Sequence, residues 1–408
     1  MITLKKGRIE IILDYLLVFM LVINSQSVYQ NSTEKNYYTF EITFALIIIC
    51  TLFKLLKYGI GKKKLLLAIG VSMLYFIYIF CFVLISVDFD QIIVFGSRYF
   101  ILPFVLLYFF SQKNNDERKK FFMYYINVVC FVSVVSVFFW TFGTFLHIIS
   151  PTNLFAFEWG SVKDYASYYN IYFETQWIDW LDGDLKRNTA IFVEGPCFAV
   201  VLCFALLFIY FFKEQVPKYK LKIFIVSVAV LTTFSVTSYA FLIVIFVLII
   251  SNNPKLRKII YTTCIPVLIV CFVVIMIMKT RTGSFALRSG DVEIVLRSWS
   301  MSPIVGNGYV DADYLSSLVT NRKNLAVASS IGVILMQGGI MFLLLYLVPI
   351  ATSLKIGIKK HQKRYIVASL SYLLLLFVVL FQTFYINFFM WVFLLFIQFF
   401  DNEKAKVA

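Results

Sequence analysis

The stretch that decides the fold is Leu221–Ser251, LKIFIVSVAVLTTFSVTSYAFLIVIFVLIIS, which contains a single charged residue, Lys222. A helix that crosses a bilayer needs roughly 20 predominantly apolar residues. This run is longer than that, and basic residues flank it on both sides, so we predict two short helices that turn back near Ser235–Ser238. The apolar positions are continuous instead of alternating, which favours helices over the strands of a membrane barrel.

Apolar runs of this kind recur along the whole chain. Hydrophobic residues make up 61% of the sequence and charged residues 14%, whereas soluble domains carry about 25% charged residues. We predict an all-α fold, a polytopic integral membrane protein with about twelve transmembrane helices. The predicted spans are 9–23, 38–56, 65–86, 92–110, 121–149, 190–212, two within 221–251, 259–278, 326–350, and two within 365–400 that turn near Gln382–Asn387.

Clusters of basic residues separate these runs. The positive-inside rule places such clusters in the cytoplasm, so we predict that both termini are cytoplasmic. The net charge of +15 then reflects the cytoplasmic loops, and we predict no binding to nucleic acid. The basic clusters are Lys5–Arg8, Lys57–Lys64, Lys113–Lys120, Lys213–Lys222, Asn252–Lys258 and Lys355–Arg364.

Two outer loops are long, Ser150–Arg187 and Lys279–Leu325. We predict one transmembrane bundle over residues 1–408. Long loops in compact proteins are often functional, so we also predict that loops 150–187 and 279–325 form an active-site face. Tyrosines at helical spacing in the first loop, from Tyr165 to Tyr172, predict a helix lying on the outer leaflet. Their rings are also suited to stacking on sugars.

The sequence offers no cofactor or metal motif. The seven cysteines fall in or at the ends of apolar segments, without a CxxC or Cys/His cluster, so we predict no disulfide framework and no metal site. No phosphate-binding glycine motif is present, and we predict no cofactor.

Arginine and lysine are distributed differently across the predicted membrane. Most lysines fall on the inner side, whereas most arginines fall on the outer side. The positive-inside rule counts lysine and arginine together, so it does not explain this difference. Guanidinium is planar and binds phosphate oxygens in pairs, so an outward-facing arginine set predicts a phosphate or diphosphate ligand. Salt bridges to the acidic first loop are the alternative. The outer arginines are Arg98, Arg187, Arg281, Arg288, Arg297 and Arg322.

Arg98 lies about 10 Å inside the fourth predicted span, at ~1.5 Å per residue. An unpaired charge at that depth costs at least ~2.5 kcal/mol, so we expect Arg98 to face a polar cavity, and Glu41 is a candidate partner. Snorkelling of Arg98 to the outer surface is the alternative. Asp14 is another acid within a span, but its place near the inner face argues against a role.

The most specific local signal is Arg187–Ala199, RNTAIFVEGPCFA. Arg187 ends the acidic loop, and Glu194 is predicted about a turn into the next span. Gly195-Pro196 is expected to break or kink the helix there, beside a carboxylate and a guanidinium. A carboxylate at a helix start followed by a tolerated kink is the alternative.

The order of motifs from residue 187 to about residue 350 resembles the O-antigen and capsule polymerase family (Wzy-type), relatives of the O-antigen ligases. The resemblance rests on Arg187 before Phe192-x-Glu194-Gly-Pro196, then the broken hairpin Thr232–Tyr239. An arginine-rich loop with Pro303-x-x-Gly306-x-Gly308 follows, and then a glycine-rich span with Gly332 and Gly338-Gly339. The ligases carry a histidine late in this loop, and Asn321–Ser330 has none.

The resemblance implies a metal-independent glycosyltransferase in the bacterial cytoplasmic membrane. It would join undecaprenyl-diphosphate-linked oligosaccharides on the outer face, with a chain-length regulator and a flippase as possible partners besides membrane lipid. The implied catalytic residues are Glu194, as base or orienter of the acceptor hydroxyl, and Arg187. The implied diphosphate-binding residues are Arg98, Arg281, Arg288 and Arg297. A lipid-linked oligosaccharide flippase or transporter, and an O-antigen ligase, are the alternatives.

Overall fold

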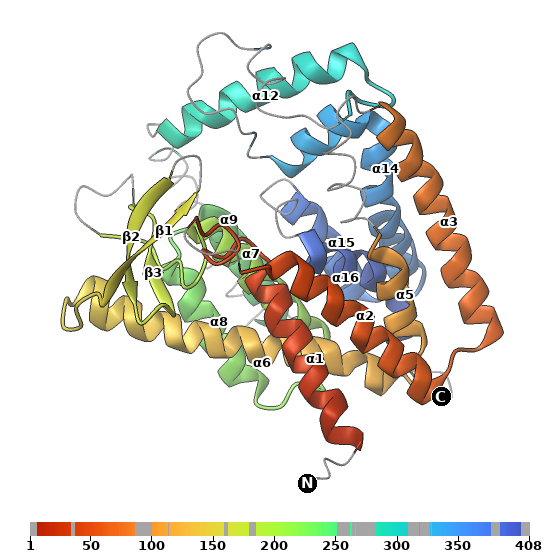
Figure 1. The fold of residues 1–408 in the computed structure, drawn as a ribbon, viewed down its shortest axis with the longest axis horizontal. Helices are drawn as coiled ribbons and strands as arrows, with labels where there is room; N and C mark the ends of the chain where they lie inside the picture. Colours follow the sequence, from red (N-terminus) through yellow and green to blue (C-terminus); the bar gives the residue numbers. More distant parts are fainter. Residues whose placement is uncertain are drawn as a thin grey trace. The chain divides into compact units, whose positions relative to one another are not determined.

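A computed structural model shows a mostly helical protein, 72% helix, with one small sheet (Figure 1). The residues that the structure describes are 6–33, 37–85, 100–112, 114–158, 162–178, 185–250, 283–308, 329–376 and 384–400, with the single residues 262, 266, 277, 318 and 327. The chain divides into two compact units. The first comprises Met1–Asn24, Tyr38–Tyr125 and Gly290–Ala408, and the second comprises Ser25–Tyr37 and Ile126–Ser289.

Four helices within the described ranges are long and apolar enough to cross a membrane. They are Thr39–Tyr58, Lys62–Phe80, Asn115–Phe145 and Ser330–Lys359, and shorter apolar helices accompany them. The outer face of Lys62–Phe80 is apolar, with Leu74 and Ile77 among its exposed side chains, as expected for a surface solvated by lipid. The prediction of apolar, membrane-type helices is confirmed, whereas the number of twelve spans stays a prediction.

The first unit is helical. Its α1 packs against α2, α2 and α3 pack against α5, and α14 packs against α15 and α16. Phe121 stacks on Phe389 with ring centroids 4.5 Å apart, and Phe109 packs edge-on against both rings. The elements are α1 (Lys6–Ile23), α2 (Thr39–Tyr58), α3 (Lys62–Ile85), α5 (Leu102–Phe110), the start of α6 (Asn115–Phe139), the end of α12 (Gly283–Met301), α14 (Ser330–Lys359), α15 (Lys363–Leu376), α16 (Phe384–Leu395) and η4 (Ile397–Phe400).

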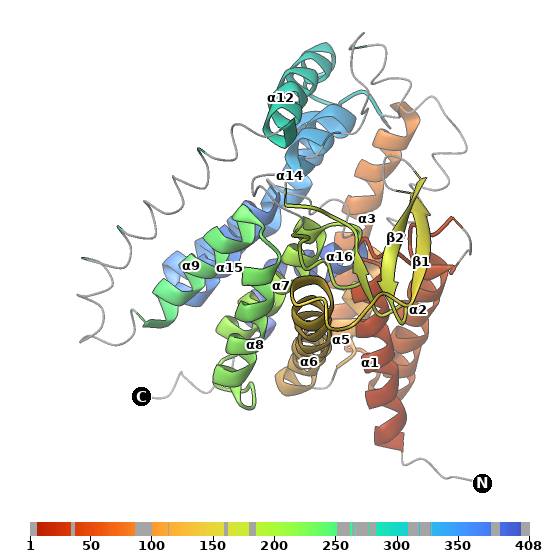
Figure 2. The same cartoon turned by 90° about the vertical axis from the view of Figure 1, so that its left-hand side faces the viewer.

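The second unit joins a helical layer to the sheet. Helix α7 is apolar all round and buried along nearly its whole length, and α8 and α9 pack beside it (Figure 2). The elements are the rest of α6, η1 (Trp140–Phe145), β1 (Asn153–Glu158), β2 (Val162–Tyr168), β3 (Tyr172–Glu174), α7 (Gly195–Phe211), α8 (Tyr219–Thr232), α9 (Val236–Ile250) and the start of α12.

The sheet corrects one prediction. Strands β1, β2 and β3 pair antiparallel in that order, with Asn153 opposite Ser167 and Tyr168 opposite Tyr172. The tyrosines from Tyr165 to Tyr172 therefore lie in two strands and a turn, so the predicted interfacial helix is wrong, and the mostly helical fold includes one small sheet. Aromatic residues favour strands, and Asn170 adopts positive φ between two aromatic runs, which is a hairpin signal.

The broken hairpin is confirmed. Helix α8 ends at Thr232, α9 begins at Val236, and Phe234 between them has φ of 50°. The stretch 365–400 also holds two helices, and the turn between them lies outside the described residues. Within the predicted loop 279–325 the structure adds a helix, α12, that sequence reasoning did not anticipate.

Candidate functional site

The segment from Arg187 to Glu194 is extended and precedes helix α7. Glu194 is the N-cap residue, with φ of −148° and ψ of 154°, and Gly195 and Pro196 are the first helical residues. The predicted place of Glu194 inside the span, with a kink after it, is therefore wrong. Proline fits the first turn of a helix, because the amide that it lacks has no intrahelical partner there.

One side of this segment is bonded to the sheet and to the chain near Val28. The Phe173 amide donates to the Ala190 carbonyl at 2.9 Å, and the Thr189 hydroxyl donates to the Phe173 carbonyl at 2.6 Å. The Val28 amide donates to the Ile191 carbonyl at 2.9 Å. These bonds fix the backbone between the two predicted catalytic residues.

The other side is bonded to α6 and to the break between α8 and α9. The Asn188 amide donates to the Thr232 carbonyl at 2.9 Å, and Asn188 Nδ2 donates to Thr232 Oγ1 at 2.9 Å and to Ser136 Oγ at 3.2 Å. Asn188 and Thr189 are fully buried. Buried polar groups are costly unless they are bonded, so this network holds the segment in one conformation.

Arg187 is 5% exposed, and its side chain folds back over Gly195. Its amide donates to the Gln176 carbonyl at 2.9 Å, and its Nε donates to the Trp177 carbonyl at 3.2 Å. A Cβ added to Gly195 would lie 3.3 Å from Arg187 Cδ and 2.9 Å from the Thr233 carbonyl. Glycine at position 195 therefore allows the Arg187 side chain and the break between α8 and α9 to approach the start of α7 this closely.

Gln176 is a site residue that sequence reasoning missed. Its backbone carbonyl accepts from Arg187, and its side-chain Oε1 accepts from the Gly195 amide at 3.1 Å, next to Glu194. One residue thus positions both predicted catalytic residues. No sequence motif marks Gln176, because its bonds to Arg187 and Gly195 join segments that are separate in the sequence.

The Glu194 carboxylate lies within electrostatic reach of Tyr165 on β2. Burial raises the pKa of Tyr165, and the negative charge of Glu194 raises it further. Tyr165 itself is stacked on Phe157 with ring centroids 4.4 Å apart. A carboxylate at such a position can accept a proton from a hydroxyl group or orient it.

A second polar cluster ties the sheet to the end of α6. Glu174 accepts from Thr144 at 2.9 Å, from Tyr168 at 2.8 Å and from Lys186 at 2.7 Å. Burial raises the pKa of Glu174, but these hydrogen bonds and the charge of Lys186 outweigh it, so the pKa of Glu174 is lowered. Lys186 Nζ also lies 4.6 Å from the centre of the Trp177 ring. The cluster holds the strand that leads to Arg187.

The other predicted arginines are placed as follows. Arg297 is exposed on α12, in the first unit, and one of its terminal nitrogens donates to the Leu318 carbonyl at 2.8 Å. Arg288 belongs to α12, but its side chain is outside the described residues, as are Arg98 and Arg281. Arg187 lies against Gly195, the residue after Glu194, and the shared diphosphate site stays a prediction.

The glycine-rich turn and the glycine-rich helix interlock in the first unit. Helix α14 is interrupted at Gly339, which has φ of 58°. The Gly308 amide donates to the Gln337 carbonyl at 2.9 Å, and the Ile340 amide donates to the Pro303 carbonyl at 3.0 Å. A Cβ on Gly306 would lie 2.3 Å from the Gln337 carbonyl oxygen. The turn supplies partners for backbone groups that the break leaves without helical ones.

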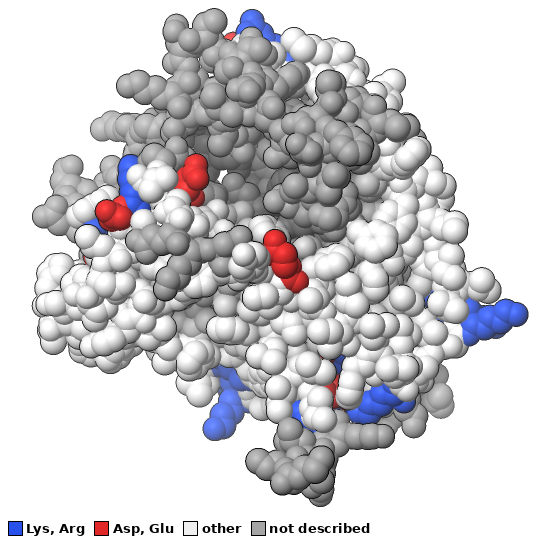
Figure 3. Space-filling view, viewed as in Figure 1, with Lys and Arg blue, Asp and Glu red and all other residues white. Residues whose placement is uncertain are grey.

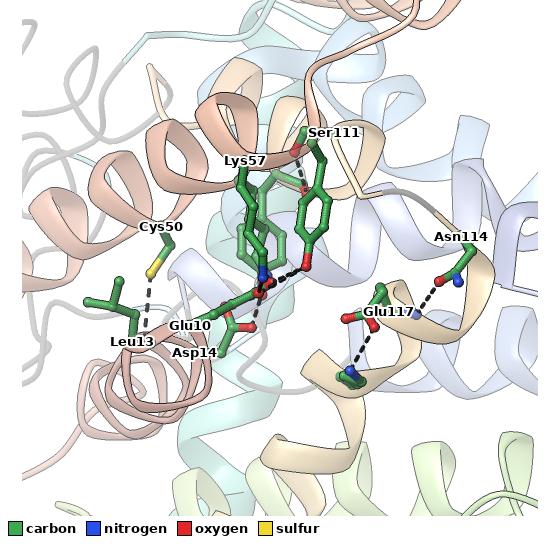
Figure 4. Close-up of polar contacts among 12 residues, drawn as sticks. Glu10, Leu13, Asp14, Cys50, Lys57, Ser111, Asn114 and Glu117 are labelled. Atoms are coloured by element: carbon green, nitrogen blue, oxygen red, sulfur yellow. Dashed lines mark hydrogen bonds and ion pairs between the residues drawn. The ribbon is translucent and has the colours of Figure 1, made fainter. Parts of the chain in front are cut away.

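A buried charge cluster joins α1 to α2 and α5, and sequence reasoning gave it no role. Lys54 Nζ lies 3.0 Å from Glu10 and 2.9 Å from Asp14, and the Tyr108 hydroxyl donates to Asp14 at 2.8 Å. Figure 4 shows Glu10 and Asp14 close together, with Lys57 directed at Glu10. Sequence reasoning placed Asp14 near the inner face, and the structure pairs it there with Lys54 and Tyr108. The signal was the spacing of Glu10 and Asp14, one helical turn apart.

No group of three or more His, Cys, Asp and Glu side chains is placed to hold a metal ion within the described ranges. Comparison of the chain with models of protein families, with curated proteins and with solved structures gave no match.

Proposed function

We propose that the protein is a membrane glycosyltransferase that polymerises lipid-diphosphate-linked oligosaccharides, with Arg187 and Glu194 in its catalytic site. The observation that carries the proposal is the close approach of Arg187 to Gly195, the residue next to Glu194, at the start of α7. Two sequence motifs that are separated along the chain, Arg187–Pro196 and Thr232–Tyr239, also meet there.

Each group suits one part of the reaction. A hydroxyl of the acceptor unit attacks the anomeric carbon of the donor, the bond from that carbon to the phosphate oxygen breaks, and the lipid diphosphate leaves. Glu194 takes or directs the hydroxyl proton. Arg187 stabilises the negative charge that grows on the leaving diphosphate, because a positioned guanidinium is most effective in a site that excludes water.

The rigidity of the segment supports a catalytic role. The backbone bonds to Phe173, Val28 and Thr232 and the buried side chains of Asn188 and Thr189 hold Arg187 and Glu194 in fixed places. A site whose groups are positioned before the substrate arrives loses no free energy in reorganising them during the reaction. A merely structural arginine in a lipid-facing helix would not require such a network.

The proposal is tested with purified full-length protein in lipid vesicles. The substrate is the lipid-linked repeat unit extracted from cells of the source organism that lack the gene. We expect a ladder of lipid-linked chains and the release of undecaprenyl diphosphate. Transport of single units across the vesicle membrane without joining would overturn the proposal in favour of a flippase. Transfer of chains only to a different lipid acceptor would overturn it in favour of a ligase.

A further inference from the structure

The depth of α6 in a bilayer can be read from its sequence. The helix begins with the charged run Asn115–Lys120, and its apolar part starts at Phe121. A hydrocarbon core of about 30 Å takes up roughly 20 residues at ~1.5 Å each. Trp140 then lies at the far boundary of the hydrocarbon, and η1, which continues the helix to Phe145, lies at the depth of the lipid headgroups.

The sheet is attached to α6 at this depth. Phe139 is stacked on Tyr172 with ring centroids 6.1 Å apart, and Tyr168 covers Gly143 so closely that a Cβ there would lie 2.6 Å from the tyrosine ring. The Thr144 hydroxyl donates to Glu174 at 2.9 Å. The end of the sheet that carries the β2–β3 turn is therefore held at the level of the headgroups.

This end of the unit exposes several large apolar side chains, which together we call the interfacial patch. The exposed residues Phe131, Val134 and Phe138 follow one face of α6 at intervals of three and four residues. The same spacing leads on to Phe142 and Phe145 of the patch. The Asn153 side chain donates to that of Asn170 at 2.8 Å, which brings the start of β1 to the turn. The interfacial patch consists of Phe142, Phe145, Ile148, Leu154, Tyr169 and Ile171.

The two ends of the sheet differ in charge. The runs His147–Phe157 and Tyr165–Phe173 contain no Asp, Glu, Lys or Arg, whereas Glu158, Lys163 and Asp164 are exposed at the opposite end. Figure 3 shows uncharged surface over the end of α6 and charged side chains of both signs above it. At ~3.3 Å per residue along β2, the charged end lies about 20 Å from the end that carries the β2–β3 turn.

We propose that the interfacial patch inserts into the headgroup region of the bilayer, so that lipid covers this end of the sheet and fixes it to the membrane. Aromatic side chains favour this region, because their rings are apolar and their polar atoms reach water. The occupant is lipid because the patch continues the lipid-facing stripe of α6 and carries no charge. Its consequence is that Glu174, which ends β3, and Gln176 and Arg187, which follow it in sequence, are held next to the headgroups of lipid-borne molecules.

The test places a bimane fluorophore on single introduced cysteines in the full-length protein, reconstituted in vesicles of plain or brominated phosphatidylcholine. Leu154→Cys and Ile171→Cys probe the interfacial patch. Val162→Cys is the matched control, because Val162 is an exposed apolar residue at the charged end of the same sheet. The unsubstituted protein, labelled in the same way, gives the background from the native cysteines.

We expect brominated lipid to reduce the bimane fluorescence at positions 154 and 171 and to leave position 162 unchanged. Iodide in the buffer should show the opposite order. Equal quenching by iodide at all three positions would overturn the proposal, since the patch would then face water. Protection of 154 and 171 from both quenchers would also overturn it, because protein would then cover the patch.

Discussion

Asn188 makes two hydrogen bonds to Thr232. Its backbone N–H donates to the Thr232 carbonyl, and its side-chain Nδ2 donates to the Thr232 hydroxyl, both at 2.9 Å. These contacts join the extended segment before α7 to the end of α8. They bring together two stretches that the sequence places far apart, and they bear directly on the position of the neighbouring Arg187.

The hydroxyl of Thr232 should matter for both stability and activity. Thr232→Val removes the acceptor of a buried Asn188 N–H and should cost roughly 1–3 kcal/mol, because an unsatisfied buried donor remains. Thr232→Ser keeps the hydroxyl and should stay close to the original protein. Thermal unfolding in detergent, measured beside polymer yield, separates the two variants. Equal behaviour of the valine and serine variants would mean that the bond does not position the segment.

Lys54 should be far more important for stability than its neighbour Lys57. The Lys54 side chain is 3% exposed between Glu10 and Asp14, whereas that of Lys57 is 30% exposed. Lys54→Met leaves the buried Asp14 without its cation and Glu10 with only Lys57, and should cost about 3–5 kcal/mol. Lys57→Met should cost no more than about 1 kcal/mol, as is usual for exposed pairs. Unfolding temperatures of the two variants give the comparison, and similar losses would contradict it.

Glycine should be required where the turn at Gly306 meets α14. Gly306 has φ of 77°, and an added Cβ would lie 2.3 Å from the Gln337 carbonyl oxygen. Gly306→Ala should therefore destabilise the first unit by at least the roughly 1–3 kcal/mol that such backbone strain costs. Gly70→Ala is the control, because nothing lies within 4 Å of its Cβ position, and it should be about 1 kcal/mol more stable than the original. A tolerated Gly306→Ala would show that the interlock is loose.

The carboxylate of Glu174 should make stability depend on pH. Its pKa in the fold is lowered from the ordinary value of 4.5, because hydrogen bonds from Lys186, Tyr168 and Thr144 outweigh the effect of burial. A group with a lowered pKa stabilises the fold above its unfolded pKa, and that stabilisation is lost as the pH falls through the folded pKa.

Glu174→Gln should therefore unfold at a lower temperature than the original at neutral pH, and the difference should shrink as the pH falls below 4.5. Unfolding temperatures across this range provide the measurement. Glu158→Gln, at an exposed carboxylate in the same sheet, should show no such trend. A difference that stays constant with pH would show that the ion pair with Lys186 adds nothing to stability.

The helical part of the fold could be predicted because its signal is local. The run Leu221–Ser251 is too long for one span and has polar residues at its middle, and the structure ends α8 at Thr232 and begins α9 at Val236. Continuous apolar sequence identifies helices in this setting, because backbone groups in lipid need partners within the same segment.

The sheet could not be predicted in the same way. The spacing of Tyr165, Tyr168, Tyr169 and Tyr172 suits one face of a helix, but strand pairing between β1 and β2 is a contact between separate segments. The positions that bind Arg187, namely the Gln176 and Trp177 carbonyls, are backbone atoms that carry no sequence signal. From the sequence, the outer arginines could be recognised as candidate phosphate-binding residues, but not their positions in the fold. The structure places Arg187 beside Gly195, the residue that follows Glu194.

The measurement that tests the central claim most directly is the rate at which vesicle-bound protein releases undecaprenyl diphosphate as it joins repeat units. Arg187→Lys keeps the charge but loses the paired geometry and should slow release about 100-fold or more. Glu194→Gln should slow it by at least about 100-fold. Arg8→Lys and Glu158→Gln, both at exposed positions, are the matched controls and should keep the original rate. Folded Arg187→Lys and Glu194→Gln proteins that join units at the original rate would contradict the account.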